Sequence, residues 1–226
     1  MNESIYSIAI DGPSGAGKST IAKGLAKRLG IVYVDTGAMY RAIGLKVMRM
    51  GGSPDDSPFV IGILPSTSVS LGFVDGIQHV FLDGEDVSGL IRTQEVSNAA
   101  SKVSAVPEVR YKLVELQKKL AEDTSVTMDG RDIGTYVLPG SKYKFFVTAS
   151  PDARTIRRYR ELEGKGRLFG MTFNELLLEM AERDKRDSGR DCMPLKKAPD
   201  AILIDTTYLS VEESIDAVMK YIKVGG

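Results

Sequence analysis

The apolar positions along the chain fall into short runs and helical repeats, and each pattern predicts an element. Short apolar runs at residues 5–10 and 31–34 predict two buried strands. Residues 18–29 and 38–50 instead repeat apolar side chains at helical spacing. A chain that begins strand, helix, strand, helix predicts a parallel sheet with helices packed against it.

The pattern changes to strict alternation near residue 66. Every second residue over 69–73 is apolar, as in a strand with one buried face. Asp-Gly pairs at 75–76 and 83–84 bracket a second apolar run, residues 77–82, and Asp-Gly between two such runs is a strong hairpin signal. We therefore expect residues 66–87 to form a small antiparallel meander inserted into the α/β unit.

The rest of the chain returns to strands and helices in alternation. Further strands are expected at residues 126–128, 144–148 and 201–204, which brings the parallel sheet to five strands. Helices are expected over residues 93–104, 108–122, 152–163, 173–187 and 211–222. Glycines at 164, 166 and 170 mark a loop between two of these helices, which we expect to be mobile.

Composition bounds the class of protein without identifying it. The 226 residues carry 30 basic and 30 acidic side chains, so net charge gives no reason to expect binding to a nucleic-acid polymer or a membrane. The single cysteine, Cys192, excludes an intramolecular disulfide. No apolar run approaches the roughly 20 residues of a transmembrane helix. We expect a soluble, cytoplasmic protein with a buried or incidental thiol.

The strongest chemical signal lies between the first expected strand and the first expected helix. The segment matches the P-loop pattern without a mismatch and reads Gly12-Pro13-Ser14-Gly15-Ala16-Gly17-Lys18-Ser19, followed by Thr20. Its glycines let backbone N–H groups turn toward phosphates, and the start of the helix adds a positive dipole end. In this pattern Lys18 reaches the β- and γ-phosphates, and the Ser19 hydroxyl binds magnesium. A glycine turn without a ligand is the alternative, but the flanking strand and helix favour nucleotide triphosphate binding.

Four further segments narrow the reaction, which the P-loop alone leaves open among ATPases, GTPases and small-molecule kinases. They are Asp35-Thr36-Gly37-Ala38-Met39-Tyr40-Arg41, Ile91-Arg92-Thr93-Gln94-Glu95 with Asn98-Ala99-Ala100-Ser101, Asp129-Gly130-Arg131-Asp132, and Glu182-Arg183-Asp184 with Asp187 and Arg190. In this order they closely resemble the bacterial cytidylate kinases, members of the nucleoside monophosphate kinase superfamily. The resemblance covers essentially the whole chain. It implies phosphorylation of CMP or dCMP by ATP, with magnesium as cofactor.

The resemblance also implies an architecture. By this resemblance, the chain is expected to have a P-loop kinase fold. This is an α/β unit with a five-stranded parallel sheet flanked by helices, an antiparallel meander in the CMP-binding region and a helical lid. We expect a single unit over residues 1–226, acting as a monomer. Its expected parts are a core at about 1–36, 123–153 and 191–226, a CMP-binding region at about 37–122 with the insert at 66–87, and a lid at about 154–190.

Residue roles follow from the resemblance, position by position. Catalytic roles fall on Lys18, Arg131, Arg157 and Arg190, and ATP binding on residues 12–20 with Arg158. CMP binding falls on Thr36, Tyr40, Arg41, Ser101, Arg110, Arg131, Asp132, Arg183, Asp187 and Arg190. Among these, Arg41, Arg131 and Arg190 match positions that grip the phosphate, where guanidinium forks suit bidentate contact. The positions that read cytosine are Ser101, Arg110 and Asp132, and an Asp accepting from its exocyclic amine has the expected polarity. Arg183 and Asp187 match positions near the ribose.

Several of these side chains also have a simpler structural interpretation. Arg183, Asp187 and Arg190 share one helix face if the helix continues through Gly189, and an exposed pair there would be worth only about 0.3–0.5 kcal/mol. Solvated surface is the default for the basic run Arg154, Arg157, Arg158 and Arg160, although its position favours a lid role for Arg157 and Arg158. Asp35 and Asp129 each end an apolar strand, and either could lie near magnesium or cap a turn.

Rival functions are a kinase for UMP or another nucleoside monophosphate and a P-loop regulatory switch. The sequence has no Asn-Lys-x-Asp motif for reading guanine, which weakens the GTPase form of a switch. In a CMP kinase the attacking phosphate oxygen is already ionised at neutral pH, because the second pKa of a monoester is about 6. The expected mechanism is therefore direct in-line transfer without a general base, in a chain with one histidine.

Overall fold

A five-stranded parallel sheet forms the centre of the computed structural model, which describes residues 5–223. The strand order is β2-β6-β1-β7-β8. The strands are β1 (Ser7–Asp11), β2 (Val32–Asp35), β6 (Val126–Gly130), β7 (Tyr143–Thr148) and β8 (Ile202–Asp205). All five were predicted, to within two residues at each end. Strand β1 lies in the middle and is apolar on both faces, because helices cover the sheet on both sides.

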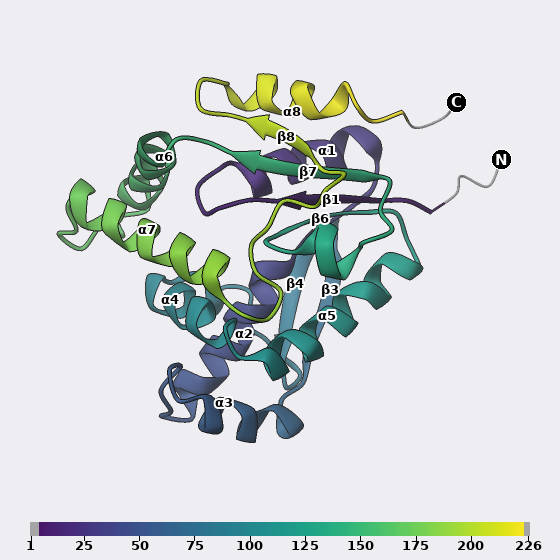
Figure 1. Cartoon of the computed structure of the whole chain (residues 1–226). Helices are drawn as coiled ribbons and strands as arrows, with labels where there is room; N and C mark the ends of the chain where they lie inside the picture. Colours follow the sequence, from purple (N-terminus) through teal and green to yellow (C-terminus); the bar gives the residue numbers. More distant parts are fainter. Residues whose placement is uncertain (1–4, 224–226) are drawn as a thin grey trace.

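Two separate cores hold the helices against the sheet. On one face, Ile8 and Ile10 pack with helices α1 (Lys18–Leu29) and α8 (Val211–Met219), the latter at the top of Figure 1. On the other face, Ala9 packs with α2 (Thr36–Arg49) and α5 (Pro107–Glu122). The α/β class predicted from the sequence is therefore confirmed.

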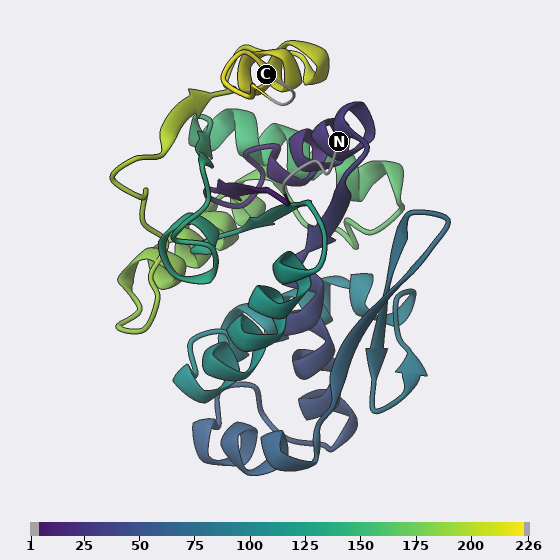
Figure 2. The ribbon, with the colours of Figure 1, turned by 90° about the vertical axis from the view of Figure 1, so that its right-hand side faces the viewer.

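The predicted meander is also confirmed, and it packs against α2 beside the main sheet (Figure 2). It consists of β3 (Val69–Val74), β4 (Ile77–Leu82) and the short β5 (Glu85–Asp86). Asp75 and Gly76 join β3 to β4 with φ angles of 50° and 73°. Two consecutive positive φ values are what a tight hairpin turn requires, so the Asp-Gly signal identified the turn correctly.

Two long helices lie beyond the carboxyl ends of β7 and β8, on the left of Figure 1. They are α6 (Pro151–Gly164) and α7 (Phe173–Gly189). Leu162 of α6 packs with Leu176 and Met180 of α7 in a small core of their own, separate from both faces of the sheet. The loop at residues 165–172 was predicted and is present; its mobility stays a prediction.

Helix α4 (Gln94–Val103) was predicted nearly to the residue, whereas several short elements were not predicted. Those not predicted are α3 (Ser57–Ile63), the 3-10 turns η1 (Leu64–Ser66) and η2 (Leu90–Arg92), and the π-helix η3 (Ile133–Val137). Each is too short to show a helical period in the sequence. The closing helix α8 also ends at Met219, earlier than the predicted residue 222.

The boundaries of the core, CMP-binding region and lid stay predictions, and residues 1–4 and 224–226 of the expected unit lie outside the described part of the chain. Across residues 5–223, none of the helices combines the length and the apolar character that crossing a bilayer requires.

Candidate nucleotide site

The carboxyl ends of the central strands gather polar side chains above one large pocket. Strand register places Asp35 beside Asp129, and Asp11 beside Gly130. The pocket has a volume of about 700 Å³. Of the site residues predicted from the sequence, all but Gly12 and Pro13 line it. In open parallel sheets this edge is where ligands bind.

The P-loop connects β1 to α1 and has the backbone that its glycines permit. Gly12 has a φ of 145°, and a Cβ there would lie 1.9 Å from the carbonyl oxygen of Val147. Gly17 has a φ of 91° and is the N-cap of α1. A larger residue at Gly12 would collide with β7, so the close approach of the loop to the sheet depends on that glycine.

Lys18 lies at the start of α1 and is only 5% exposed. Its ammonium donates a hydrogen bond to the carbonyl oxygen of Pro13 at 2.6 Å. Burial and, after it, the charge of Arg131 lower the pKa of Lys18 to about 7, whereas Asp129 acts in the opposite direction. A bound polyphosphate would favour the charged form of this side chain.

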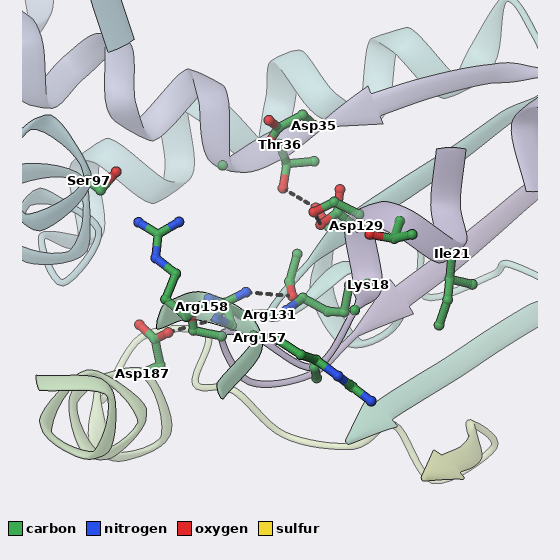
Figure 3. A pocket seen from close by; sticks show the side chains of 18 of the residues that line it. Lys18, Ile21, Asp35, Thr36, Ser97, Asp129, Arg131, Arg157, Arg158 and Asp187 are labelled. Atoms are coloured by element: carbon green, nitrogen blue, oxygen red, sulfur yellow. Dashed lines mark hydrogen bonds and ion pairs between the residues drawn. The ribbon is translucent and has the colours of Figure 1, made fainter. Parts of the chain in front are cut away.

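Three oxygen-bearing side chains surround the place where the P-loop meets β6. The Ser19 hydroxyl donates to Oδ2 of Asp129 at 2.8 Å, and the Tyr33 hydroxyl donates to Oδ1 at 2.8 Å. Burial raises the pKa of Asp129, and the neighbouring Asp35 carboxylate adds to this effect. Figure 3 shows Asp35 and Asp129 on the same side of the pocket as Lys18. Hydroxyl and carboxylate oxygens suit magnesium, which proteins hold through one or two such groups together with substrate phosphates.

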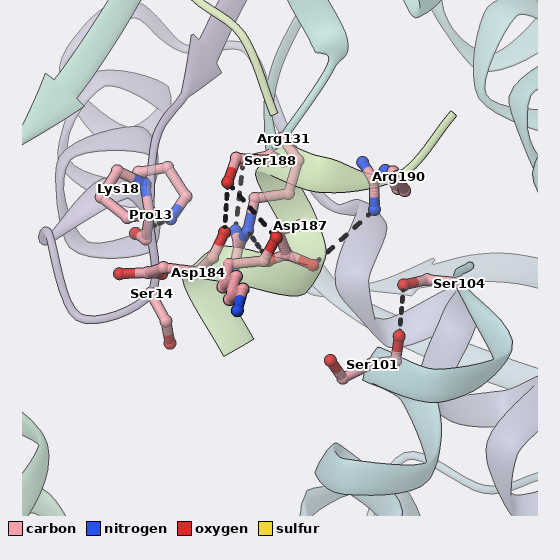
Figure 4. A network of polar contacts seen from close by, with 12 residues as sticks. Pro13, Ser14, Lys18, Ser101, Ser104, Arg131, Asp184, Asp187, Ser188 and Arg190 are labelled. Carbon is pink, nitrogen blue, oxygen red and sulfur yellow. Dashed lines mark hydrogen bonds and ion pairs between the residues drawn. The ribbon is translucent and has the colours of Figure 1, made fainter. Parts of the chain in front are cut away.

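One buried carboxylate, Asp187, lies among several arginines, and Figure 4 shows its contacts with Arg131 and Arg190. Arg131 donates from Nε to Asp187 at 2.7 Å, and Arg190 lies 3.7 Å from its other oxygen. Burial alone would raise the pKa of Asp187, but the charges of Arg131 and Arg183 outweigh burial and lower it. Burial, followed by repulsion from Arg131, lowers the pKa of Arg183 to about 10.

These arginines keep hydrogen-bond donors for a further partner. Within residues 5–223, no hydrogen-bond partner is found for Nε of Arg41, Nε of Arg183 or Nη2 of Arg190, although all three atoms are buried. A buried guanidinium donor without a partner costs free energy. An anion bound between these side chains would satisfy the donors and relieve the repulsion among the charges.

The deepest part of the pocket holds a second ion pair. Arg110 is 1% exposed, donates to the Asp132 carboxylate, and lies 5.4 Å from the ring centroid of Tyr40. The Ser101 hydroxyl is buried and has no hydrogen-bond partner within the described chain, and the Tyr40 hydroxyl is buried beside Gln117. This end of the pocket thus offers donors and acceptors at fixed positions beside an aromatic ring.

The end of β2 is tied to the meander and to α2. Asp35 accepts from Arg41 at 2.7 Å and from the N–H of Ala38 at 3.1 Å, so it caps α2. Gln78 of β4 bonds the backbone of Asp35 on both sides: its Oε1 accepts from the N–H at 2.8 Å, and its Nε2 donates to the carbonyl at 3.2 Å. The Thr36 hydroxyl donates to the carbonyl oxygen of Asp129 at 2.7 Å, which links α2 to β6.

Two arginines of α6, Arg157 and Arg158, line the pocket on the side of the two long helices. Arg157 donates to the Thr206 hydroxyl at 2.9 Å, and Arg158 donates to Oε1 of Gln94 at 2.8 Å. In Figure 3 their guanidinium groups point in different directions. Gln94 in turn donates to Glu179 of α7 at 2.7 Å, so helix α4 touches both long helices.

The structure corrects two of the simpler interpretations. Asp187 is 4% exposed, so its pairs with Arg131 and Arg190 do not form an exposed salt bridge. Arg154 is 8% exposed rather than solvated; it donates to the Ser14 carbonyl at 3.0 Å and to Asp184. Arg154 contacts the P-loop, and no signal in the sequence separated it from Arg160, which is exposed.

Asp11 is another residue that the sequence analysis did not single out. It ends β1, is 3% exposed, and accepts from the N–H groups of Ile133 and Gly134 at 2.8 Å each. Burial raises its pKa to about 6, although both backbone hydrogen bonds act to lower it. The signal in the sequence was the position of Asp11 directly before Gly12, at the end of an expected central strand. A carboxylate there is buried and must find hydrogen-bond partners.

Comparison with known proteins places this site in a family. The sequence model described as cytidylate kinase matches residues 8–224. A cytidylate kinase from Caldicellulosiruptor bescii is 52% identical, covering 94% of this chain and 93% of the relative. A cytidylate kinase from Caldanaerobacter subterraneus subsp. tengcongensis is also 52% identical, covering 96% and 94%. Among solved structures, a sugar kinase from Janibacter sp. aligns with a TM-score of 0.50 at 13% identity, covering 98% of this chain and 96% of that one. At that identity the likeness shows the fold alone.

Proposed function

The chain belongs to the cytidylate kinase family and is an ATP-dependent nucleoside monophosphate kinase, and we propose that its pocket transfers the γ-phosphoryl group of ATP to CMP or dCMP. The products are ADP with CDP or dCDP. One observation carries the proposal: a single pocket joins a P-loop to a cluster of half-buried arginines, three of which have a buried donor without a partner within residues 5–223. A kinase for two phosphorylated substrates needs both anion sites within reach of each other.

ATP binds at the P-loop end. Backbone N–H groups of residues 14–19 and the N-terminus of α1 receive the α- and β-phosphates, and Lys18 reaches the β- and γ-phosphates. Thr20 and Arg158 line the same end of the pocket. Arg157, bonded to Thr206, connects α6 to the segment after β8 and lies on the donor side.

The phosphate of CMP binds between Arg41, Arg131 and Arg190. The proposal is supported by the free donors on Arg41 and Arg190, and by the position of Arg131 beside Lys18, which lowers the pKa of that lysine. Arg131 then lies between the two substrates, where charge develops on the transferred phosphoryl group. Arg183 and Asp187 face the ribose.

Cytosine binds at the Arg110 and Asp132 end of the pocket. A carboxylate can accept from the exocyclic amine of cytosine, and Arg110 or the Ser101 hydroxyl can donate to the ring nitrogen and carbonyl. Tyr40 provides an apolar face. UMP has a carbonyl at the ring position where CMP has an amine. The Asp132 carboxylate and that carbonyl are both hydrogen-bond acceptors, so the pocket disfavours UMP.

The reaction is a direct in-line displacement. A nonbridging oxygen of the CMP phosphate forms a bond to the γ-phosphorus, and the bond from that phosphorus to the β,γ-bridging oxygen breaks, leaving ADP. The attacking oxygen is ionised at neutral pH because the second pKa is about 6, so no side chain need remove a proton. Lys18 and the arginines offset the repulsion between the two anions and hold them in line.

Ser19 and Asp129, with Asp35 nearby, would hold magnesium, which when bound neutralises phosphate charge and orients the β- and γ-phosphates. The network that Tyr33 and Ser19 form with Asp129 supports this assignment. Asp129 bonds the P-loop serine directly, whereas Asp35 pairs with Arg41, so we assign Asp129 to the metal and Asp35 to the acceptor side.

A regulatory switch explains the site less well, because it needs no second cluster of arginines opposite the P-loop. Acceptance of dCMP, a monomeric state and a cytoplasmic location stay predictions from the sequence.

Phosphorus NMR tests the reaction directly. Mixing the protein with ATP, magnesium and CMP should convert the γ-phosphate resonance into the β-phosphate resonance of CDP, with ADP in equal amount. Inorganic phosphate should not accumulate beyond a control without CMP. Release of inorganic phosphate at the same rate with or without CMP would contradict the proposed transfer and favour a hydrolytic switch.

A further inference from the structure

Asp11 holds the backbone that carries two of the proposed acceptor residues. Its two carboxylate oxygens accept one hydrogen bond each, from Ile133 and from Gly134, and both distances are 2.8 Å. These N–H groups belong to the first turn of η3, where a helix has no internal acceptors for its own donors. Asp11 therefore satisfies both donors in a place that water does not reach.

The residues directly before Ile133 are Arg131 and Asp132. On their N-terminal side, the sheet fixes Gly130, which pairs with Asp11 in the register of β1 and β6. On their C-terminal side, the side chain of Asp11 fixes Ile133 and Gly134. One residue thus anchors this short segment at both ends, through its backbone and through its side chain.

Asp11 is also the residue directly before Gly12, the first residue of the P-loop. Its own backbone position is set by β6 on one side and β7 on the other. Within residues 5–223, its side chain bonds only the backbone N–H groups of Ile133 and Gly134. The charge of Asp132 raises the pKa of the Asp11 carboxyl, and the charge of Lys18 lowers it.

We propose that Asp11 is a positioning residue, which holds Arg131 and Asp132 in register with the P-loop so that donor and acceptor phosphates meet in line. The inference rests on the proposed function. A buried carboxylate is costly, and an apolar side chain in this place would leave two N–H groups without acceptors. The positions of Arg131 and Asp132, at the CMP end of the pocket, therefore depend on β1, the strand that leads into the P-loop.

Asp11→Asn tests the contact with almost no change of volume. The amide has one acceptor oxygen, so one of the two N–H groups must face an NH₂ group. We expect kcat/KM for CMP to fall roughly 10- to 100-fold, the range that follows from a small misplacement of reacting groups. The ratio of kcat/KM for CMP to that for UMP should also fall, because Asp132 is displaced. Affinity for ADP alone, measured by calorimetry, should stay within about twofold, since the P-loop glycines are unchanged.

Two further variants keep the test decisive. Gly134→Ala places a Cβ 3.3 Å from Oδ2 of Asp11 and 3.3 Å from the side chain of Lys144, and should reproduce the same changes more weakly even if Asp11→Asn does not fold. Asp200→Asn removes an exposed carboxylate that pairs with Lys144, and should leave all three measurements unchanged. Thermal unfolding of each variant separates loss of fold from loss of position.

The outcomes separate the inference from the function on which it rests. If the natural protein does not phosphorylate CMP, the proposed function is wrong whatever Asp11 does. If it does, and Asp11→Asn keeps kcat/KM and base selectivity within about twofold, the inference is overturned. An equal loss of ADP affinity and of CMP turnover would also overturn it, because Asp11 would then support the fold of the whole site.

Discussion

At the scale of single residues, several arginines of this pocket lie close enough to repel one another. Asp187 is one carboxylate among Arg131, Arg183 and Arg190, and it is buried with them. Like charges at such distances repel, and low solvent access strengthens the repulsion. We expect a bound phosphate to relieve this repulsion. The arginine that bonds Asp187 most directly is Arg131, and its position beside Lys18 makes it the first target for substitution.

Arg131→Ala should lower kcat roughly a thousandfold, as expected for removal of an arginine that stabilises a transferring phosphoryl group. The protein should stay folded, because Asp187 retains Arg183 and Arg190 as neighbours. Steady-state kinetics with CMP and a thermal melt measure the two effects. Arg131→Lys should recover only part of the loss, since an ammonium cannot bond two oxygens in one plane.

The matched control is Arg28→Ala, which removes an arginine from exposed pairs with Glu212 and Asp216. Surface pairs of this kind contribute little, so kcat should not change. Turnover within tenfold of the natural protein in Arg131→Ala would remove Arg131 from the mechanism.

Among the elements, the meander has a direct link to the site through Gln78. The two amide atoms of this side chain bond the backbone of Asp35, which caps α2 and pairs with Arg41. Strand β2 is the edge of the main sheet, and Gln78 supplies there the bonds that a neighbouring strand would make. The insert thereby holds the backbone of Asp35, whose carboxylate pairs with Arg41.

Gln78→Leu keeps the volume of the side chain and removes both hydrogen bonds. Each bond is worth about 0.5–1.5 kcal/mol, so KM for CMP should rise roughly tenfold. KM for ATP should not change, because Gln78 bonds the backbone of Asp35 and not the P-loop. Initial rates at varied CMP and at varied ATP give both constants.

Arg49→Ala provides the comparison, because Arg49 also joins α2 to the meander, through an exposed pair with Glu85. Its loss should leave both KM values unchanged. Equal effects of the two substitutions would show that general loosening of the insert, and not the bonds to Asp35, determines CMP binding.

The element scale also shows what the sequence can predict. The five strands, the P-loop and the hairpin turn at Asp75 were predicted because each has a strong local signal: an apolar run, a glycine pattern, or an Asp-Gly pair. The π-helix η3 has five residues and no period, and its first turn depends on Asp11, which is 122 positions away from Ile133. A contact of that kind follows from the fold and not from neighbours in the chain.

The candidate site shows the same division. Residues in recognisable motifs were identified, and the structure brings nearly all of them to one pocket. Arg154 was missed because it lies in the same basic run as Arg160, and only their positions around α6 separate the buried side chain from the exposed one. Gln78 was missed because an isolated glutamine in a strand has no distinguishing pattern.

At the scale of the whole molecule, the pocket joins three parts of the fold. The P-loop lies at the sheet, Ser101 and Arg110 come from α4 and α5, Arg131 and Asp132 directly follow β6, and Arg157, Arg158 and Arg183 come from α6 and α7. Gln94 already bridges α4 to Arg158 and Glu179, so the helical side contacts the acceptor side in this structure. A ligand that bonds all three parts should stabilise the entire molecule.

CMP should therefore raise the melting temperature, and cytidine should not. At a concentration 100 times its Kd, a ligand stabilises the folded state by about 2.7 kcal/mol. For a chain of this size that corresponds to roughly 5–10 °C. Cytidine lacks the anion that satisfies Arg41 and Arg190, so its shift at the same concentration should be about 1 °C or less, and inorganic phosphate should give a partial shift. Equal shifts with CMP and cytidine would contradict the assignment of the arginines to the phosphate.

The central claim is that this pocket phosphorylates a cytosine nucleotide. The most direct test is the initial rate of ADP formation from ATP and magnesium, with CMP, dCMP, UMP, AMP and GMP offered in parallel against a control without acceptor. We predict rapid turnover with CMP and dCMP, weaker turnover with UMP, and rates near the control with AMP and GMP. Fastest turnover with a purine nucleotide, or ADP release that needs no acceptor, would contradict the account.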